Sequence, residues 1–180
     1  MKHPFPSTNT KGRILNQLLN FFWTFLCFLP LLWYWAIESP DGWFYSSIVI
    51  SLACSFLPEA FYKFLQFSNT TKTYEKYGVK IIRKFVQHGD LINRSFRLKS
   101  PGYKVIKGVR QLNSYLKTIA MYERYHFMCF LFFLFTAVHN LSTHRFLFAV
   151  LITVCNAVYN ICPIFLQQYN RLRIQRLLRE

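Results

Sequence analysis

Long apolar runs alternate with polar, basic stretches along the chain. Four of these runs approach or exceed the roughly 20 residues that a helix needs to cross the hydrocarbon core of a bilayer. They cover residues 16–37, 43–65, 122–141 and 146–168. The pattern predicts an all-α integral membrane protein, and we prefer this interpretation to a buried hairpin in a soluble bundle.

The spacing of the runs predicts two helical hairpins. Residues 38–42 have the composition of a turn, and residues 142–145 form a similarly short link. We therefore expect a single membrane domain over residues 1–180, with about four transmembrane helices in two hairpins and a basic amphipathic cytoplasmic segment at 66–121 between them. The first run exceeds the core of a usual signal peptide and lacks a clear cleavage site, so we expect a retained helix.

Composition and charge sharpen this topology. The chain is 53% hydrophobic and only 16% charged, whereas a soluble domain carries about 25% charge. It has 22 Lys and Arg against 7 Asp and Glu, a net charge of +15. Among these bases only Arg145 lies in a short link between runs. The positive-inside rule therefore predicts that both termini and the central segment lie on the cytoplasmic side of a bacterial cytoplasmic membrane.

The central segment has the pattern of an interfacial helix. Over residues 74–86 apolar side chains recur at helical spacing, and basic side chains occupy much of the opposite face. We expect the helix to end near residues 87–90, a second break at 100–102, and a further helix over 109–120 that feeds into the third run. Such bases bind anionic lipid headgroups. Nucleic acid is a poor alternative partner, because a membrane anchor beside the bases already explains them.

One acidic residue, Glu59, falls inside the second run directly after Pro58. Ionisable groups within a span are costly and are candidates for function. Glu59 is therefore a candidate substrate-binding residue, and pairing with a polar group of another helix is an equally open interpretation.

Glu123 and His126 stand at the start of the third run, three residues apart. This spacing places both on one helix face. A carboxylate beside an imidazole raises its basicity and fixes its tautomer, so the pair predicts a general base for an alcohol nucleophile. A di-metal site needs this motif twice, and only one copy is present, so we expect no metal and no cofactor. All five cysteines lie in apolar runs without a C-x-x-C pair, and we expect neither a disulfide nor a cysteine metal site.

The fourth run carries amides on an apolar background and ends in a polar, basic sequence. Asn156 and Asn160 are four residues apart, and Pro163 is expected to open the backbone ladder locally. Amides of this kind also join membrane helices structurally. Guanidinium groups at the headgroup level suit a phosphate, a carboxylate or an oxyanion, although plain positive-inside flanking also explains arginine. The candidate substrate-binding residues are Asn160, Gln167, Tyr169, Asn170, Arg171 and Arg173. His139 and Asn140, at the opposite end of the third run, receive a structural interpretation.

Three blocks of sequence resemble the glycosyl-4,4'-diaponeurosporenoate acyltransferase family of bacterial carotenoid (staphyloxanthin-type) biosynthesis. They are Tyr74-Glu75-Lys76-Tyr77-Gly78 with the later Asp90, Glu123-x-x-His126, and Asn160 with Gln167-x-Tyr169-Asn170-Arg171-x-Arg173. The resemblance implies esterification of a sugar hydroxyl on a membrane lipid by a fatty acyl group.

Position and chemistry then suggest a role for each residue. His126 is expected to act as general base oriented by Glu123. Asn170, Arg171 and Arg173 are expected to hold the anionic part of the acyl donor or the oxyanion. Asn160 and Gln167 are expected to position the acceptor, which is a lipid or carotenoid-like molecule. No Ser or Cys nucleophile with an adjacent base is visible, which favours direct transfer. The alternative function is a non-catalytic membrane scaffold or anionic-lipid-binding subunit.

Overall fold

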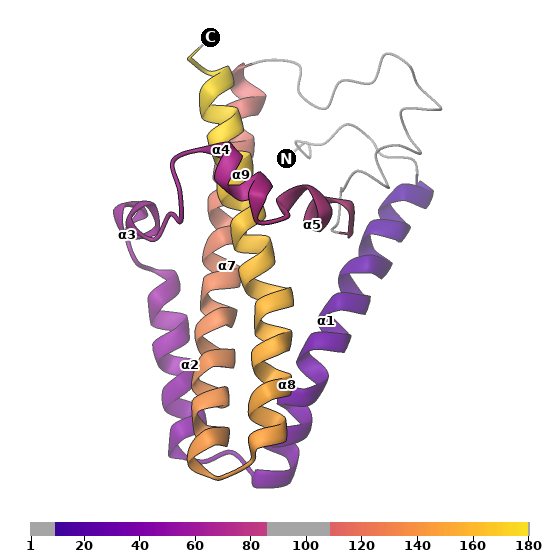
Figure 1. Ribbon diagram of the computed structural model, residues 1–180, viewed down its shortest axis with the longest axis vertical. Coiled ribbons are helices and arrows are strands. Elements are labelled where there is room, and N and C mark those ends of the chain that lie inside the picture. Colours follow the sequence, from indigo (N-terminus) through magenta and orange to yellow (C-terminus); the bar gives the residue numbers. More distant parts are fainter. Residues whose placement is uncertain (1–9, 86–108, 180) are drawn as a thin grey trace.

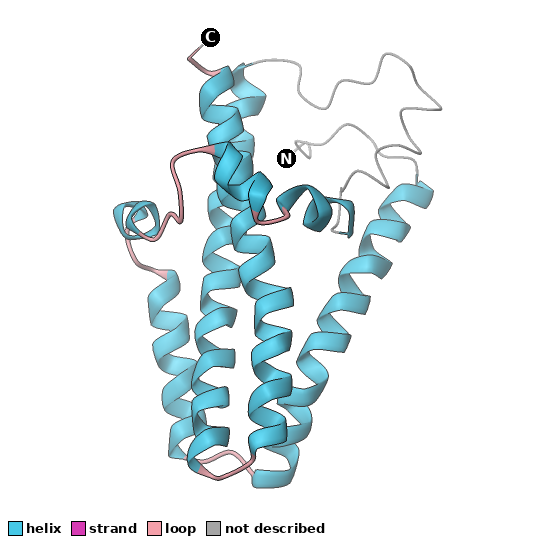
Figure 2. Cartoon of the chain, viewed as in Figure 1, coloured by secondary structure: helices cyan, strands magenta, loops and turns pink. Residues whose placement is uncertain are grey.

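The computed structural model describes residues 10–85 and 109–179. Within these ranges the regular elements are all helical, as Figure 2 shows. The expected all-α class is therefore confirmed. Three helices are long and apolar enough to cross a membrane, namely Asn16–Glu38, Leu112–Ser142 and Phe146–Leu177. The fourth crossing and the arrangement in two hairpins stay predictions.

The first and third runs form uninterrupted helices. α1 covers Thr10–Glu38 and α7 covers Val109–Ser142. The expected helix over 109–120 is the first part of α7, which continues directly into the third apolar run. Large apolar side chains on α1, such as Phe21 and Phe25, point outward and are about 70% exposed (69% and 72%). Exposure of this kind on a long helix suits contact with lipid tails.

The second run does not form one helix. α2 covers Gly42–Ser55 and α3 covers Glu59–Phe64, and the backbone leaves the helical path between them. Pro58 precedes the first residue of α3 and has no N–H to continue the ladder of α2. At 1.5 Å per residue, α2 is about 21 Å long, shorter than a hydrocarbon core of about 30 Å. A single helix over 43–65 is therefore wrong.

Packing places the helices in the order α2, α7, α8, α1 (Figure 1). α8 covers Phe146–Asn156, and α7 and α8 form the central antiparallel pair. α2 packs against α7, and α1 packs against α8. The first two helices thus flank the central pair. Asp41 caps α2 by accepting a hydrogen bond from the Phe44 N–H at 2.9 Å.

The fourth run contains a widened turn. α8 continues into a π-helix, η1, over Ala157–Ile161, and then into α9 over Cys162–Leu177. In this turn the Cys162 N–H donates to the Ala157 carbonyl, five residues earlier. Pro163 follows directly and cannot donate to the Tyr159 carbonyl as a regular helix requires. The expected opening of the ladder at Pro163 therefore takes the form of η1.

The described part of the basic segment is two short helices. α4 covers Thr71–Lys76 and α5 covers Val79–Phe85. Gly78 between them has a φ of +79°, a left-handed conformation that ends α4. The expected single helix over 74–86 is therefore wrong, although its helical character is retained on both sides of the break. The expected breaks near 87–90 and 100–102 lie outside the described residues.

The two ends of the bundle differ in the elements that they carry. The basic end holds α4, α5 and the C-terminal half of α9, and the turn end holds residues 39–41 and 143–145 (Figure 1). α4 and α5 pack against α9 at the basic end. A hydrogen bond from Trp23 Nε1 to the Phe85 carbonyl, at 3.1 Å, joins α1 to α5.

Candidate functional site

A buried ion pair between α7 and α9 lies at the basic end of the bundle. Arg171 Nη1 donates to Glu123 Oε2, and the two side chains are only 10% and 3% exposed. The second carboxylate oxygen, Oε1, accepts from Gln168 Nε2 at 3.1 Å. Both oxygens of Glu123 are therefore committed to α9.

Gln168 connects this ion pair to the segment before α4. Its Oε1 accepts from the Phe67 N–H at 3.1 Å and lies 2.9 Å from the Tyr74 hydroxyl. That hydroxyl also lies 3.0 Å from the Ser68 carbonyl, and with one proton it donates to one of these oxygens at a time. Tyr74 is fully buried, and burial raises the pKa of its phenol, so the hydroxyl stays protonated.

Gln66 completes the cluster around Arg171. Gln66 Oε1 accepts from Arg171 Nη2 at 2.9 Å, while Gln66 Nε2 donates to the Ser68 carbonyl at 2.8 Å. Arg171 Nε is buried, and within the described part of the chain it has no hydrogen-bond partner. The guanidinium group is thus held through both of its Nη atoms, while its buried Nε–H has no partner among the described residues.

An outer layer ties α4 and α5 to α9. The Tyr169 hydroxyl donates to Glu75 Oε1 at 3.1 Å, and Lys80 Nζ lies 2.6 Å from Glu75 Oε2. The hydrogen bond from Lys80 lowers the pKa of Glu75. Arg173 is exposed and stacks over the Tyr169 ring, 5.6 Å from its centroid. Arg171 and Arg173, two residues apart, therefore have opposite environments.

His126 belongs to a second polar group, one helical turn deeper in α7. Its Nδ1 lies 3.5 Å from Asn160 Oδ1. Asn160 Nδ2 donates to Asn156 Oδ1 at 2.9 Å, and Asn156 Nδ2 donates to the Phe130 carbonyl at 3.1 Å. Asn160 lies in η1, so the widened turn contributes directly to this group.

A row of hydroxyls lies beside His126. Tyr159 Oη is 3.3 Å from Tyr125 Oη and 3.0 Å from Thr24 Oγ1. The ring centroids of Tyr125 and Tyr159 lie 5.2 and 5.6 Å from that of His126. The imidazole is thus flanked by two phenols, which can donate hydrogen bonds to an oxygen that develops negative charge.

The expected Glu123–His126 pair is replaced by partners on the neighbouring helices. Gln168 and Arg171 take both oxygens of Glu123, whereas His126 contacts the Asn160 side chain and the Tyr159 backbone in η1. The two residues share a helix face, but η1 and α9 contact that face at different depths. Glu123 therefore does not orient His126 directly.

Glu59 lies apart from both groups. It begins α3, its side chain is 67% exposed, and it pairs with Lys63 at 3.0 Å one turn later. The hydrogen bond from Lys63 lowers the pKa of Glu59. The expected acid within a helical span is therefore a surface carboxylate in an exposed ion pair, because the chain breaks at Pro58.

Of the remaining candidates, Tyr169 and Arg171 are in the cluster and Asn160 contacts His126, whereas Gln167 and Asn170 are half-buried outside these contacts. Sequence reasoning missed Gln66, Tyr74 and Gln168 as members. Gln168 stands beside Gln167 in the same motif, but the sequence does not show which of the two adjacent side chains faces α7. In the described residues, no group of three or more His, Cys, Asp or Glu side chains is arranged to hold a metal ion.

His139 forms a further cluster at the turn end. Its Nδ1 lies 2.7 Å from the Tyr34 hydroxyl and its Nε2 lies 3.4 Å from Asp41 Oδ2. Trp35 stacks on the ring, with the centroids 5.1 Å apart. Asn140 is fully buried and donates to the Thr136 carbonyl at 2.7 Å. These contacts join α1, α2 and α7 and support the structural interpretation of His139 and Asn140.

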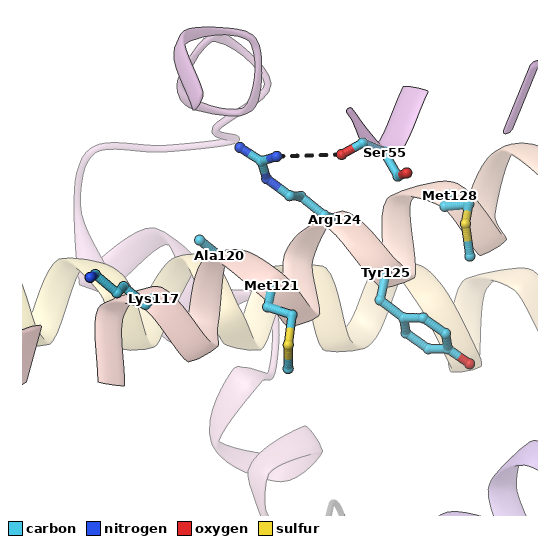
Figure 3. A pocket seen from close by; sticks show the side chains of 7 residues that line it. All are labelled: Ser55, Lys117, Ala120, Met121, Arg124, Tyr125 and Met128. Atoms are coloured by element: carbon cyan, nitrogen blue, oxygen red, sulfur yellow. Dashed lines mark hydrogen bonds between the residues drawn. The ribbon is translucent and has the colours of Figure 1, made fainter. Parts of the chain in front are cut away.

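A shallow hollow runs along α7 on the side of Tyr125 (Figure 3). Its lining is formed mainly by apolar side chains. Two cations also line it, Lys117 toward the basic end and Arg124 near the middle of the hollow. Arg124 reaches the Ser55 carbonyl at 3.4 Å, as Figure 3 shows, and covers the Tyr62 ring at 5.1 Å. The hollow therefore combines an apolar floor with positive charge and reaches a phenol that flanks His126.

Comparison with known proteins adds a family to this geometry. The model of a family described as glycosyl-4,4'-diaponeurosporenoate acyltransferase matches residues 58–180. The match includes α3 to α9 and both polar groups, and it begins after α1 and α2. No curated protein and no solved structure matches the chain.

Proposed function

Because the chain belongs to the glycosyl-4,4'-diaponeurosporenoate acyltransferase family, we propose that it is a membrane acyltransferase that esterifies a sugar hydroxyl of a lipid or carotenoid-like acceptor with a fatty acyl chain. The observation that carries the proposal is His126, an imidazole between two phenols within an apolar bundle. Carotenoid biosynthesis is the process that the family implies.

His126 is the proposed general base. It removes the proton from the acceptor hydroxyl while the hydroxyl oxygen attacks the acyl carbonyl and the bond from the acyl carbon to the leaving group breaks. The proton then passes from the imidazolium to the leaving group, so the ring returns to its neutral form. Tyr125 and Tyr159 supply hydrogen bonds to the oxyanion that forms at the carbonyl, and Gln167 positions the acceptor. Asn160 is fully buried between Asn156 and His126, so its proposed role is to hold the imidazole.

The structure revises the proposed role of Glu123. Glu123 and Arg171 neutralise each other and hold α7 against α9, so we propose that they position the helices around His126. Arg173 and Asn170 are proposed to contact the anionic part of the donor at the basic end, and the buried Tyr169, which donates to Glu75, is proposed to support Arg173 through its ring. The apolar side chains that line the hollow beside Tyr125 are proposed to contact the donor's acyl chain, and Lys117 and Arg124, which also line it, to contact the anionic part.

We place the protein in the bacterial cytoplasmic membrane, with both termini and the basic end on the cytoplasmic side. The apolar helices suit a membrane, and the distribution of Lys and Arg supports this orientation. α5 exposes Ile81 and Phe85 beside its bases, which supports a position at the headgroup level in contact with anionic lipid.

The test is acyl transfer by the purified protein in lipid nanodiscs. The probes are a palmitoyl thioester as donor and a long-chain glucoside as acceptor, and the ester product is measured by mass spectrometry. We expect turnover that falls at least about 100-fold in His126→Ala, because general bases contribute about 10²–10⁴-fold. His139→Ala, which changes a histidine at the turn end, is the matched control and should retain turnover. Full turnover in His126→Ala would overturn the assignment of the base.

A second candidate function is a non-catalytic scaffold or anionic-lipid-binding subunit. The neutralised pair Glu123–Arg171 favours it, because a buried ion pair whose two members are also hydrogen-bonded to Gln168 and Gln66 suits a purely structural site. Under this alternative the thioester and glucoside give no ester product. Arg173→Lys would then leave binding to vesicles that contain phosphatidylglycerol unchanged, because only the charge matters.

A further inference from the structure

Two buried amides connect His126 to a fixed backbone group. Asn156 donates to the Phe130 carbonyl at 3.1 Å, and Asn160 donates to Asn156 Oδ1 at 2.9 Å. Asn160 Oδ1 then lies 3.5 Å from His126 Nδ1. The chain of contacts starts on the backbone of α7, crosses to α8 and η1, and returns to a side chain of α7.

The carbonyl of Phe130 decides which amide groups donate and which accept in this series of hydrogen bonds. A backbone carbonyl oxygen only accepts hydrogen bonds, so Asn156 must turn its NH₂ group toward Phe130. Its oxygen then remains for Asn160, which must present its own NH₂ group. Asn160 is left with its carbonyl oxygen facing the imidazole, and that oxygen also only accepts.

We propose that Asn156 and Asn160 hold neutral His126 with its proton on Nδ1, which leaves Nε2 as the basic nitrogen. In a neutral imidazole one nitrogen donates and the other accepts, so an acceptor at Nδ1 selects this tautomer. The inference rests on the proposed function in one respect, since it names the atom of His126 that takes the proton. Asn156 is a positioning residue, because it acts on the ring only through Asn160.

η1 contributes by carrying Asn160 one turn beyond Asn156. The π-helix begins directly after Asn156, and Pro163 disfavours a return to the regular ladder. π-helical turns inside α-helices often accompany functional sites. Here the widened turn presents one amide to the imidazole and the other to the backbone of α7.

The test reads the tautomer directly by nuclear magnetic resonance. His126 is one of five histidines, and its ring signals in ¹⁵N-histidine-labelled protein are assigned by their loss in His126→Gln. In nanodiscs at pH 8 we expect the ¹⁵N shifts of the Nδ1–H tautomer. A ring with its proton on Nε2 in the unmodified protein would overturn the proposal, and this measurement does not require enzymatic turnover.

Asn156→Leu tests the relay itself. This variant should release the amide of Asn160 and give a mixture of the two tautomers, and kcat for acyl transfer should fall about tenfold with KM unchanged. Asn140→Leu, which changes a buried asparagine of α7 at the turn end, is the matched control and should leave the His126 signals unchanged. An unaltered tautomer in folded Asn156→Leu would exclude Asn156 from the relay. The Nδ1–H tautomer in a protein that transfers no acyl group would uphold this inference while refuting the proposed function.

Discussion

The buried pair Glu123–Arg171 predicts strong energetic coupling between α7 and α9. Arg171→Leu removes the guanidinium group and leaves Glu123 buried, with Gln168 as its remaining hydrogen-bond donor among the described residues. It also leaves Gln66 Oε1 without the donor that it has at 2.9 Å. Arg171→Leu and, by the same reasoning, Glu123→Leu each retain a buried polar or charged group that has lost a partner.

The magnitude follows from the burial of both side chains, which are 10% and 3% exposed. Removing one member of a buried ion pair costs about 3–5 kcal/mol, because the remaining charge loses its compensation. The double variant Glu123→Leu/Arg171→Leu leaves no charge behind. We expect it to cost about as much as one single variant, which corresponds to a coupling free energy of about 3 kcal/mol.

The assay is a double-mutant cycle on the free energy of unfolding. The four tryptophans report chemical unfolding in detergent micelles by fluorescence. Arg173→Leu is the matched control, since this arginine is exposed over the Tyr169 ring and its loss should cost at most about 1 kcal/mol. A coupling free energy below about 0.5 kcal/mol would refute the reasoning, because it would show that Glu123 and Arg171 act independently.

Three further predictions concern the polar groups and the widened turn. Tyr74→Phe should lower the free energy of unfolding by about 1–3 kcal/mol, measured in the same assay, because Gln168 loses a buried hydrogen-bond donor. The contribution of Glu75 to stability should be complete above its ordinary pKa of 4.5 and should be lost as the pH falls through its lower folded-state pKa, measured as protease sensitivity of α4 and α5 against pH. A constant sensitivity down to pH 3 would contradict this. Pro163→Ala restores a donor for the Tyr159 carbonyl, so we expect a regular helix, unchanged or higher stability, and a lower kcat for acyl transfer. Unchanged kcat would show that η1 is not needed for activity.

Much of the fold follows from residue pattern alone. The runs at 16–37 and 146–168 and the helix at 109–120 lie within α1, α8–α9 and α7, because long apolar periodicity leaves few alternatives to helix. Breaks were harder to place. α2 ends at Ser55, three residues before Pro58, and Gly78 divides a segment whose apolar spacing is helical on both sides. A single glycine in a helical pattern is often tolerated, so its left-handed conformation is decided by packing.

In the candidate site, too, the sequence indicated which side chains matter but not which of them contact one another. The sequence indicated that Glu123, His126, Asn160, Tyr169 and Arg171 have a special role, since polar groups in apolar helices need partners. It did not give the partners. Glu123 and His126 share a helix face, yet one contacts α9 and the other contacts η1.

By itself, the sequence determined the helical class, the apolar helices and the concentration of positive charge toward one end, because these depend on local periodicity and composition. The tertiary structure alone decided which polar groups meet. The order α2, α7, α8, α1 and the extra residue in the turn before Pro163 set the depth and rotation of each facing helix. A hydrogen bond forms only when the donor and acceptor atoms come within about 3.5 Å of each other, which requires both the depth and the rotation of the facing helices to match. No pattern along one helix contains that information.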